Sequence, residues 1–318
     1  MNLKKHNNGD VAILSIKKES WLKRDLKYWQ LYVFLLPGVL ALLIFHYYPI
    51  YGIQIAFKKF IPGLPMSESP WIGFDHFERF FSAPDSWRII WNTLKISLVS
   101  QVLLFPLPLI FALSLNQVQH IRRKKFIQNV TYIPHLFSIV IVMTMAVVLC
   151  APKTGIINIL VERITGEPIL FFGDGKYVLP IYVITGQWAG LGYSAIMYLS
   201  ALSSVDQEQL EAAEIDGASR MRIIWSIELP ALKDTIVILL ILGCGHLFTV
   251  GADKMLLIQT DLNLDASEVI GTYSYKTGLI NNDFAFSTAI SLFNNIANVV
   301  LLLLINGISS KLTDNSIL

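Results

Sequence analysis

The apolar positions of this chain are gathered into six long runs that contain no Asp, Glu, Lys or Arg, at residues 28–57, 96–121, 126–152, 177–205, 235–252 and 284–310. Each run is at least about as long as the roughly 18–20 residues that an α-helix needs to cross a bilayer. Because backbone polar groups in lipid must pair within the protein, helices are the expected form of these runs. The pattern predicts an all-α integral membrane protein with six transmembrane helices, over residues of about 28–57, 90–118, 126–152, 177–203, 235–256 and 284–310.

Composition and charge distribution agree with a membrane location and predict an orientation. Of the 318 residues, 54% are hydrophobic and 15% are charged, whereas soluble domains carry about 25% charged residues. Bases gather in a tail at residues 1–27 and in the segment 122–125. Since Lys and Arg concentrate on the cytoplasmic side, we expect this tail and both termini in the cytoplasm, with residues 28–318 forming one multi-pass membrane domain. In the connector between the third and fourth spans, residues 156–164 predict a short helix.

A polar connector at residues 204–234 separates the fourth predicted span from the fifth. Ser204 opens an S-x-x-Q string that has the form of a helix capping box. Gly217 suits the end of that helix because it adopts the left-handed conformation easily. Ser219 can cap a second short helix, and Pro230 disfavours helical geometry at the residue before it, so this helix should stop near residue 228. The expected form is helix, sharp turn, helix and a stiff exit.

The connector also carries a long ordered pattern, E-A-A-x-x-D-G-A-x(8)-I-x-L-P, at residues 211–230. It resembles the EAA signature of type I ABC importer permeases. The resemblance implies that residues 211–217 form a coupling helix, seated in a groove of a cytoplasmic ATP-binding cassette subunit. The expected coupling residues are Glu211, Ala212, Ala213, Asp216, Gly217, Ala218, Leu229 and Pro230.

Further strings resemble the permeases of lipoprotein-linked sugar importers of Gram-positive bacteria, of the polysaccharide and oligosaccharide type. These are FLLPG at 34–38, YKTGL at 275–279, DFAFSTA at 283–289 and LFN at 292–294. The resemblance implies import of an oligosaccharide or complex glycan. It also implies a second homologous permease subunit, two ABC ATPase subunits and an extracytoplasmic solute-binding lipoprotein as partners.

The chain carries no sign of catalysis of its own. A P-loop needs G-x-x-x-x-G-K-[ST] to cradle phosphates, and no string here matches it. We therefore expect ATP and Mg²⁺ to bind on the partner ATPases, and this non-catalytic subunit to hold no cofactor. No metal-ligand spacing appears among the histidines, and lipid rather than nucleic acid is the expected environment.

Polar side chains within the predicted spans are candidates for a sugar pathway, because such groups usually face a bundle interior or a cavity. Amides and aromatic rings suit a sugar, which offers hydroxyls to bond and faces to stack. The alternative is hydrogen bonding between helices, which we favour for each residue taken singly. The pathway candidates are Gln187, Trp188, Tyr193, His246, Asn294 and Asn298.

Three other functions stay open at this stage. The same fold could import another solute, such as an amino acid or phosphate, although the strings near the last span argue for sugar. An ion-coupled secondary transporter should carry acids within its spans, and the six apolar runs contain none. A membrane enzyme should show a cluster of His, Asp and Glu at one membrane face, and no such cluster is visible.

Overall fold

The computed structural model of the chain describes residues 28–245 and 247–313. Within these ranges the structure consists of helices, and its one β-bridge joins Lys58 to Trp71. The described residues divide into two compact units, one ending at Ile53 and the other beginning at Gln54. The predicted tail at 1–27 lies outside the described residues. The all-helical prediction is confirmed.

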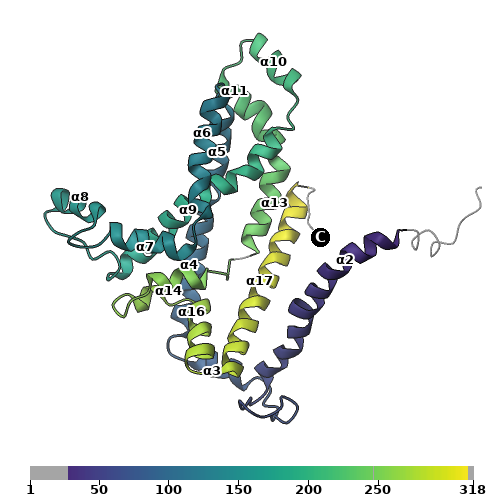
Figure 1. Cartoon of the computed structure of the whole chain (residues 1–318), viewed down its shortest axis with the longest axis vertical. Helices are drawn as coiled ribbons and strands as arrows, with labels where there is room; N and C mark the ends of the chain where they lie inside the picture. Colours follow the sequence, from purple (N-terminus) through teal and green to yellow (C-terminus); the bar gives the residue numbers. More distant parts are fainter. Residues whose placement is uncertain (1–27, 246, 314–318) are drawn as a thin grey trace, which may run out of the picture. The chain divides into compact units, whose positions relative to one another are not determined.

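The helices follow the sequence in one order, drawn in Figure 1. They are α2 (Trp29–Leu42), η1 (Leu43–Tyr47), η2 (Tyr48–Phe57), α3 (Asp75–Ser82), α4 (Ser86–Leu104), α5 (Pro106–Asn116), α6 (Ile121–Tyr132), η3 (Ile133–Leu136), α7 (Ile139–Leu149), α8 (Ile156–Thr165), η4 (Gly175–Tyr177), α9 (Val178–Leu202), α10 (Gln207–Ile215), α11 (Arg220–Ile223), η5 (Ile224–Glu228), α12 (Leu229–Ala231), α13 (Lys233–Cys244), α14 (Ala252–Ile258), α15 (Leu264–Ser267), α16 (Ile270–Tyr275), η6 (Lys276–Ile280) and α17 (Phe284–Thr313).

Three helical segments among the described residues are long and apolar enough to cross a membrane: Trp29–Phe57, Ser86–Asn116 and Phe284–Gly307. The second of these joins α4 to α5 without a break, although it contains Pro106. The proline is the first residue of α5, and Phe105 before it keeps helical dihedral angles. A fourth span exists if the bent pair of helices at 121–149 counts as one. The number of six spans stays a prediction.

The third predicted span, 126–152, is not one continuous helix. The helical segments Ile121–Leu136 and Ile139–Leu149 meet at an angle of 98°. Pro134 lies in the 3₁₀ turn that ends the first segment, and Phe137 after it is extended. The Ser138 side chain then accepts a hydrogen bond from the Ile141 backbone N–H at 3.4 Å, which caps α7 as a new helix. The predicted third span is therefore bent, because the cap at Ser138 starts a new helix in a different direction.

The fifth predicted span, 235–256, is also interrupted. Helix α13 ends at Cys244 and α14 begins only at Ala252. Gly243 and Gly245 flank the end of α13, and a Cβ added at either one would collide with a side chain of α4 or α17. Those close approaches require glycine, which weakens the helix at the same place. Helix α8, by contrast, confirms the short helix predicted at 156–164.

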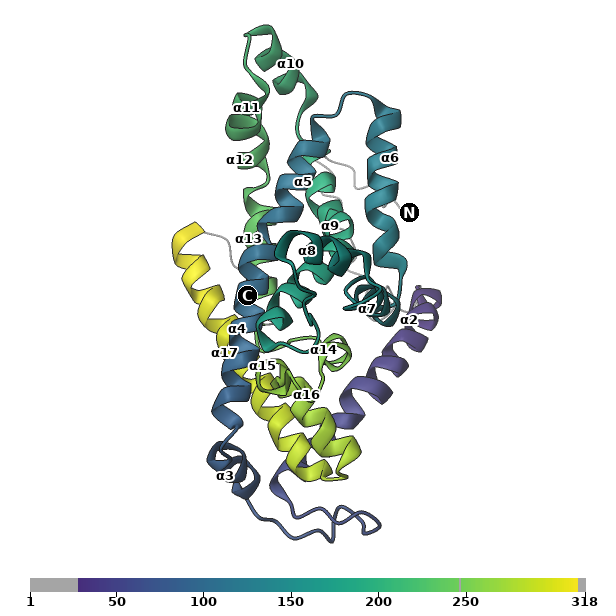
Figure 2. The same cartoon turned by 90° about the vertical axis from the view of Figure 1, so that its left-hand side faces the viewer.

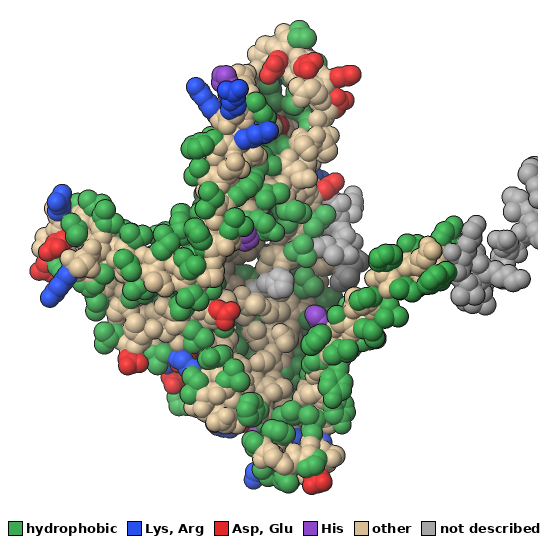
Figure 3. Space-filling model, in the orientation of Figure 1, with side chains coloured by type: hydrophobic (Ala, Val, Ile, Leu, Met, Phe, Trp, Pro, Cys, Tyr) green, Lys and Arg blue, Asp and Glu red, His purple; other side chains and the backbone are tan. Residues whose placement is uncertain are grey.

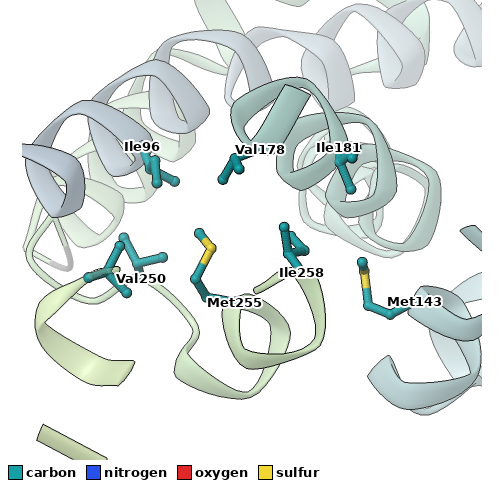
Figure 4. Packing of buried hydrophobic residues seen from close by; sticks show 8 residues of the cluster. Ile96, Met143, Val178, Ile181, Val250, Met255 and Ile258 are labelled. Atoms are coloured by element: carbon teal, nitrogen blue, oxygen red, sulfur yellow. The ribbon is translucent and has the colours of Figure 1, made fainter. Parts of the chain in front are cut away.

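Three buried clusters hold the described part of the second unit together, and two of them lie beside the elements discussed below. In the first, shown in Figure 4, α14 contributes Met255 and Ile258, which pack against side chains of α4, α7 and α9. The second cluster joins α5 and α9 to the base of the polar connector, where Leu232 is fully buried. Close packing is the main source of helix association in an apolar solvent. In this unit α10 and α11 lie at one end, and α3 and α16 at the opposite end (Figure 1, Figure 2).

Candidate functional site: the polar connector and the polar groups of the spans

The polar connector, residues 204–234, begins with helix α10, which carries the first half of the EAA pattern. Asp206 caps it, and its carboxylate accepts a hydrogen bond from the Glu208 backbone N–H at 3.0 Å. The prediction that Ser204 caps this helix is wrong. Its hydroxyl donates to the Ala201 carbonyl at 2.7 Å, because the backbone of Ser203–Val205 still bonds back onto the end of α9.

A glycine turn ends α10. Gly217 has a φ of +76°, in the left-handed region that favours glycine. Its N–H donates to the Glu214 carbonyl at 3.0 Å, and the Ala218 N–H donates to the Ala213 carbonyl at 2.9 Å. This pair of bonds is a Schellman motif. The predicted helix end at Gly217 is confirmed, and the turn sets the direction in which the second half of the connector leaves.

The second half of the connector is α11, η5 and α12. Ser219 caps α11 as predicted, since its hydroxyl oxygen accepts from the Arg222 N–H at 3.4 Å. The prediction that the helix stops near residue 228 is wrong, because Leu229 has helical dihedral angles (φ −66°, ψ −42°). A π-helical turn at Ile224–Glu228 leads into Pro230. Such a turn changes the backbone pairing locally and accommodates the missing proline N–H.

The surface of the connector fits an interface with another protein. Every residue of α10 has some exposure, and its acidic side chains form the red group at the tip in Figure 3. Large apolar side chains are exposed beside them: Ile215, Met221 and Trp225. A hollow of about 320 Å³ lies between the two halves of the connector, lined by Ala213, Asp216, Ala218, Arg222, Ile223, Ser226 and Ile227. Three of the predicted coupling residues thus line one hollow: Ala213, Asp216 and Ala218.

Leu229 and Pro230 lie apart from that hollow, at the base of the connector. Beside them is a residue that sequence reasoning missed. Glu228 is 2% exposed, and its carboxylate accepts hydrogen bonds from the side-chain amides of Asn116 and Gln117 at the end of α5. In the sequence it stands at the variable position of I-x-L-P, so the pattern drew no attention to it.

The pathway candidates are distributed over several places in the structure. Tyr193 lines a hollow of about 360 Å³ with Gln101, Ser194 and Gly243. Its ring stacks on His135 with 3.9 Å between ring centroids. Trp188 lines a different and wholly apolar hollow of about 320 Å³ with residues of α7. The structure therefore does not bring Trp188 and Tyr193 to one cavity.

The amide candidates differ in their partners. Gln187 Nε2 and Asn294 Oδ1 are buried and have no hydrogen-bond partner among the described residues. Asn298 is 9% exposed and bonds to the segment that follows α13. His246 lies outside the described residues. Gln187 and Asn294 therefore each keep one polar atom without a partner among the described residues, whereas Asn298 fits the alternative of hydrogen bonding within the bundle.

A buried cation beside Tyr182 and Gly186 of α9 was also missed. Lys254 of α14 is 8% exposed, and its ammonium donates to the Tyr182 carbonyl at 2.5 Å. It lies 4.2 Å from the centroid of the Tyr182 ring. An added Cβ at Gly186 would lie 3.0 Å from Lys254 Nζ. Within 28–245 and 247–307, no carboxylate forms an ion pair with this lysine. No group of three or more His, Cys, Asp or Glu in the described part of the chain could hold a metal ion.

Comparison with known proteins places these features in context. The sequence model of the family described as "Binding-protein-dependent transport system inner membrane component" matches residues 105–313. Protein LplB of Bacillus subtilis is 40% identical over 306 residues, which cover 95% of each chain. The polygalacturonan/rhamnogalacturonan transport system permease protein YteP of the same organism is 38% identical and covers 90% of this chain and 89% of its own.

Two solved structures of bacterial alginate ABC transporters are also similar. One transporter, involved in the import of the acidic polysaccharide alginate, has a chain that superimposes with a TM-score of 0.84 at 35% identity, covering 92% of this chain and 99% of its own. The other is in complex with an alginate pentasaccharide-bound periplasmic protein, with a TM-score of 0.85 at 34% identity, covering 94% and 100%.

Proposed function

Because this chain belongs to the family of binding-protein-dependent transport system inner membrane components, we propose that it carries an acidic oligosaccharide across the membrane and is driven through its polar connector. The chain is a multi-pass permease subunit of a bacterial ABC sugar importer, with the type I permease fold. The observation that carries the proposal is an exposed EAA helix on a chain that matches oligosaccharide importers over nine-tenths of its length.

The energy comes from partner subunits. Two cytoplasmic ABC ATPases bind ATP and Mg²⁺, and a second homologous permease pairs with this chain. An extracytoplasmic lipoprotein captures the sugar and delivers it. The alginate transporter in complex with a sugar-bound periplasmic protein supports this arrangement.

The polar connector is the part that the ATPases move. Glu211 presents a carboxylate to a base of the ATPase, and Ala212 and Ala213 allow its surface to approach the helix backbone. The Schellman turn at Gly217, with Asp216 and Ala218, keeps the helix at a fixed angle to the rest of the connector. Leu229 and Pro230 lie at its base, next to buried Leu232, and pass the movement to α13.

The acidic character of the cargo is supported by Lys254. A buried ammonium group that lacks a carboxylate partner is unfavourable in a protein interior. It becomes favourable when a carboxylate arrives, as it would with each uronic acid unit of the cargo. Gln187, with an unpaired amide nitrogen on the neighbouring helix α9, adds a donor for sugar hydroxyls. The relatives that transport polygalacturonan or alginate agree with this chemistry.

The test is uptake by the complete importer in proteoliposomes that contain ATP. The complex of both permeases, the ATPases and the binding protein is supplied with an oligogalacturonide or with a malto-oligosaccharide of equal length. We expect uptake of the acidic sugar and little uptake of the neutral one. Equal uptake of both sugars, or uptake of the neutral sugar alone, contradicts the acidic cargo, and uptake that does not need ATP contradicts the importer mechanism.

A further inference from the structure

Glu228 is a buried carboxylate that joins two parts of the fold distant in sequence. Asn116 Nδ2 donates to Glu228 Oε1 at 2.7 Å. Gln117 Nε2 lies 2.9 Å from Oε1 and 3.0 Å from Oε2, so it bonds to both oxygens. Glu228 is the last residue of the π-helical turn η5, whereas Asn116 ends α5 and Gln117 follows it.

A further hydrogen bond extends this link to α6. Lys124, in the first turns of α6, donates from Nζ to the Asn116 Oδ1 atom at 3.1 Å. The chain of hydrogen bonds therefore runs from the connector through Glu228 and Asn116 to Lys124. Lys124 belongs to the basic segment 122–125. The base of the connector is thus tied to the α5–α6 turn by charge-assisted hydrogen bonds, which are stronger than neutral ones.

Because Glu228 is buried, water cannot easily replace the hydrogen bonds that its carboxylate accepts. A carboxylate at 2% exposure is almost wholly shielded from water, and the amides of Asn116 and Gln117 supply the hydrogen bonds that water would otherwise make. Ile223 and Leu232, on either side of Glu228 in sequence, are buried as well. A rigid, fully paired junction of this kind transmits displacement, because packed interiors do not deform continuously.

We propose that Glu228 is a positioning residue that makes the α5–α6 turn move together with the polar connector. This rests on the proposed function, in which ATPases displace the connector. In this arrangement a displacement of α10 is transmitted along two routes. The continuous backbone transmits it to α13, and the hydrogen bonds of Glu228 transmit it to α4–α5 and α6. The second and third predicted spans then follow the ATPase although neither carries the EAA pattern.

Three variants separate coupling from simple stability. Glu228→Gln keeps the shape of the side chain but removes the charge and turns one acceptor into a donor that faces Gln117. Gln117→Glu alone places two carboxylates together. The double variant, Gln117→Glu with Glu228→Gln, restores one amide and one carboxylate in exchanged positions. Glu162→Gln, at an exposed position of α8, is the matched control.

The experiment uses the assembled importer and two readouts. One is the number of sugars taken up per ATP hydrolysed. The other is the distance between spin labels at Gln209→Cys in α10 and Lys125→Cys in α6, in a background without Cys150 and Cys244, measured without nucleotide and with ATP and vanadate. The wild-type label distance should stay nearly constant, because both segments move together.

In Glu228→Gln we expect the importer to assemble and to hydrolyse ATP. Sugar uptake per ATP should fall about tenfold, a size consistent with the loss of one buried charge-assisted hydrogen bond. The distance between the two labels should change on ATP binding. The exchanged pair should recover most of the uptake. Glu228→Gln with wild-type uptake and label distance overturns the proposal, as does an exchanged pair no better than Glu228→Gln. A wild-type importer that hydrolyses ATP but does not take up the acidic sugar contradicts only the proposed cargo. The label distances still test the role of Glu228, because they are measured in the absence of sugar.

Discussion

Asn298 in α17 receives a hydrogen bond on Oδ1 from the Phe248 backbone N–H at 2.8 Å. Its Nδ2 atom donates to Thr249 Oγ1 at 2.9 Å. Both partners lie in the stretch that interrupts the fifth predicted span between α13 and α14. A broken helix inside a membrane is tolerated where neighbouring helices satisfy its free backbone groups, and Asn298 does this for one N–H.

We predict that Asn298→Leu lowers the stability of the protein. The substitution keeps the side-chain size but leaves the partly buried Phe248 N–H without its partner, which costs about 1 kcal/mol. A fall in the unfolding temperature of the purified protein in detergent would show it. Val299→Leu, at an exposed neighbouring position, is the control and should leave that temperature unchanged. An unchanged temperature for Asn298→Leu would mean that the break between α13 and α14 has another support.

We predict that substitutions at Gly217 are graded by their tolerance of the left-handed conformation. No atom lies within 4 Å of a Cβ added there, so the penalty comes from φ of +76° and amounts to about 1–2 kcal/mol for an ordinary L-residue. Gly217→Ala and Gly217→Val should reduce sugar uptake in proteoliposomes to a similar degree, while Gly217→Asn retains more because Asn visits this region. Greater damage from Val than from Ala would point to steric conflict with the ATPase instead.

We predict that Glu211→Ala separates ATPase binding from folding. Glu211 is exposed, and its side chain is within hydrogen-bond reach only of Gln207, at 3.5 Å, among the described residues. The variant should reach the membrane in normal amounts and unfold at the wild-type temperature. Recovery of the ATPase in a mild-detergent pull-down should fall about tenfold, because the interface would lack one of its charged groups. Normal recovery and normal uptake would remove Glu211 from the coupling surface.

We predict that Lys254→Met changes cargo preference. Methionine fills similar space without the charge. Because no carboxylate among the described residues pairs with this buried ammonium group, its removal should leave stability equal or higher. Uptake of an oligogalacturonide should fall about tenfold, the equivalent of about 1.4 kcal/mol, and Lys254→Arg should retain more of it. A parallel loss of uptake and stability in both variants would assign Lys254 to packing alone, around the Tyr182 ring.

Much of the local structure of the polar connector was predictable because its causes lie within a few residues. The left-handed turn at Gly217 and the cap at Ser219 depend on backbone conformation and on side chains that reach their own N–H groups. The same reasoning went wrong at Ser204 and at Pro230. There the outcome depends on the last turn of α9 and on a π-helical turn, which propensities do not report.

The sequence by itself determined that this chain is helical, rich in apolar segments and equipped with an EAA connector, because apolar run lengths and capping residues act locally. Only the tertiary structure decided where the runs break and which polar groups meet. Glu228 forms a hydrogen bond with Gln117, 111 residues away in the sequence. Asn298 forms one with Phe248, 50 residues away. Such pairs form where packing brings two helices together. The pattern of apolar residues along one helix does not specify which other helix will pack against it.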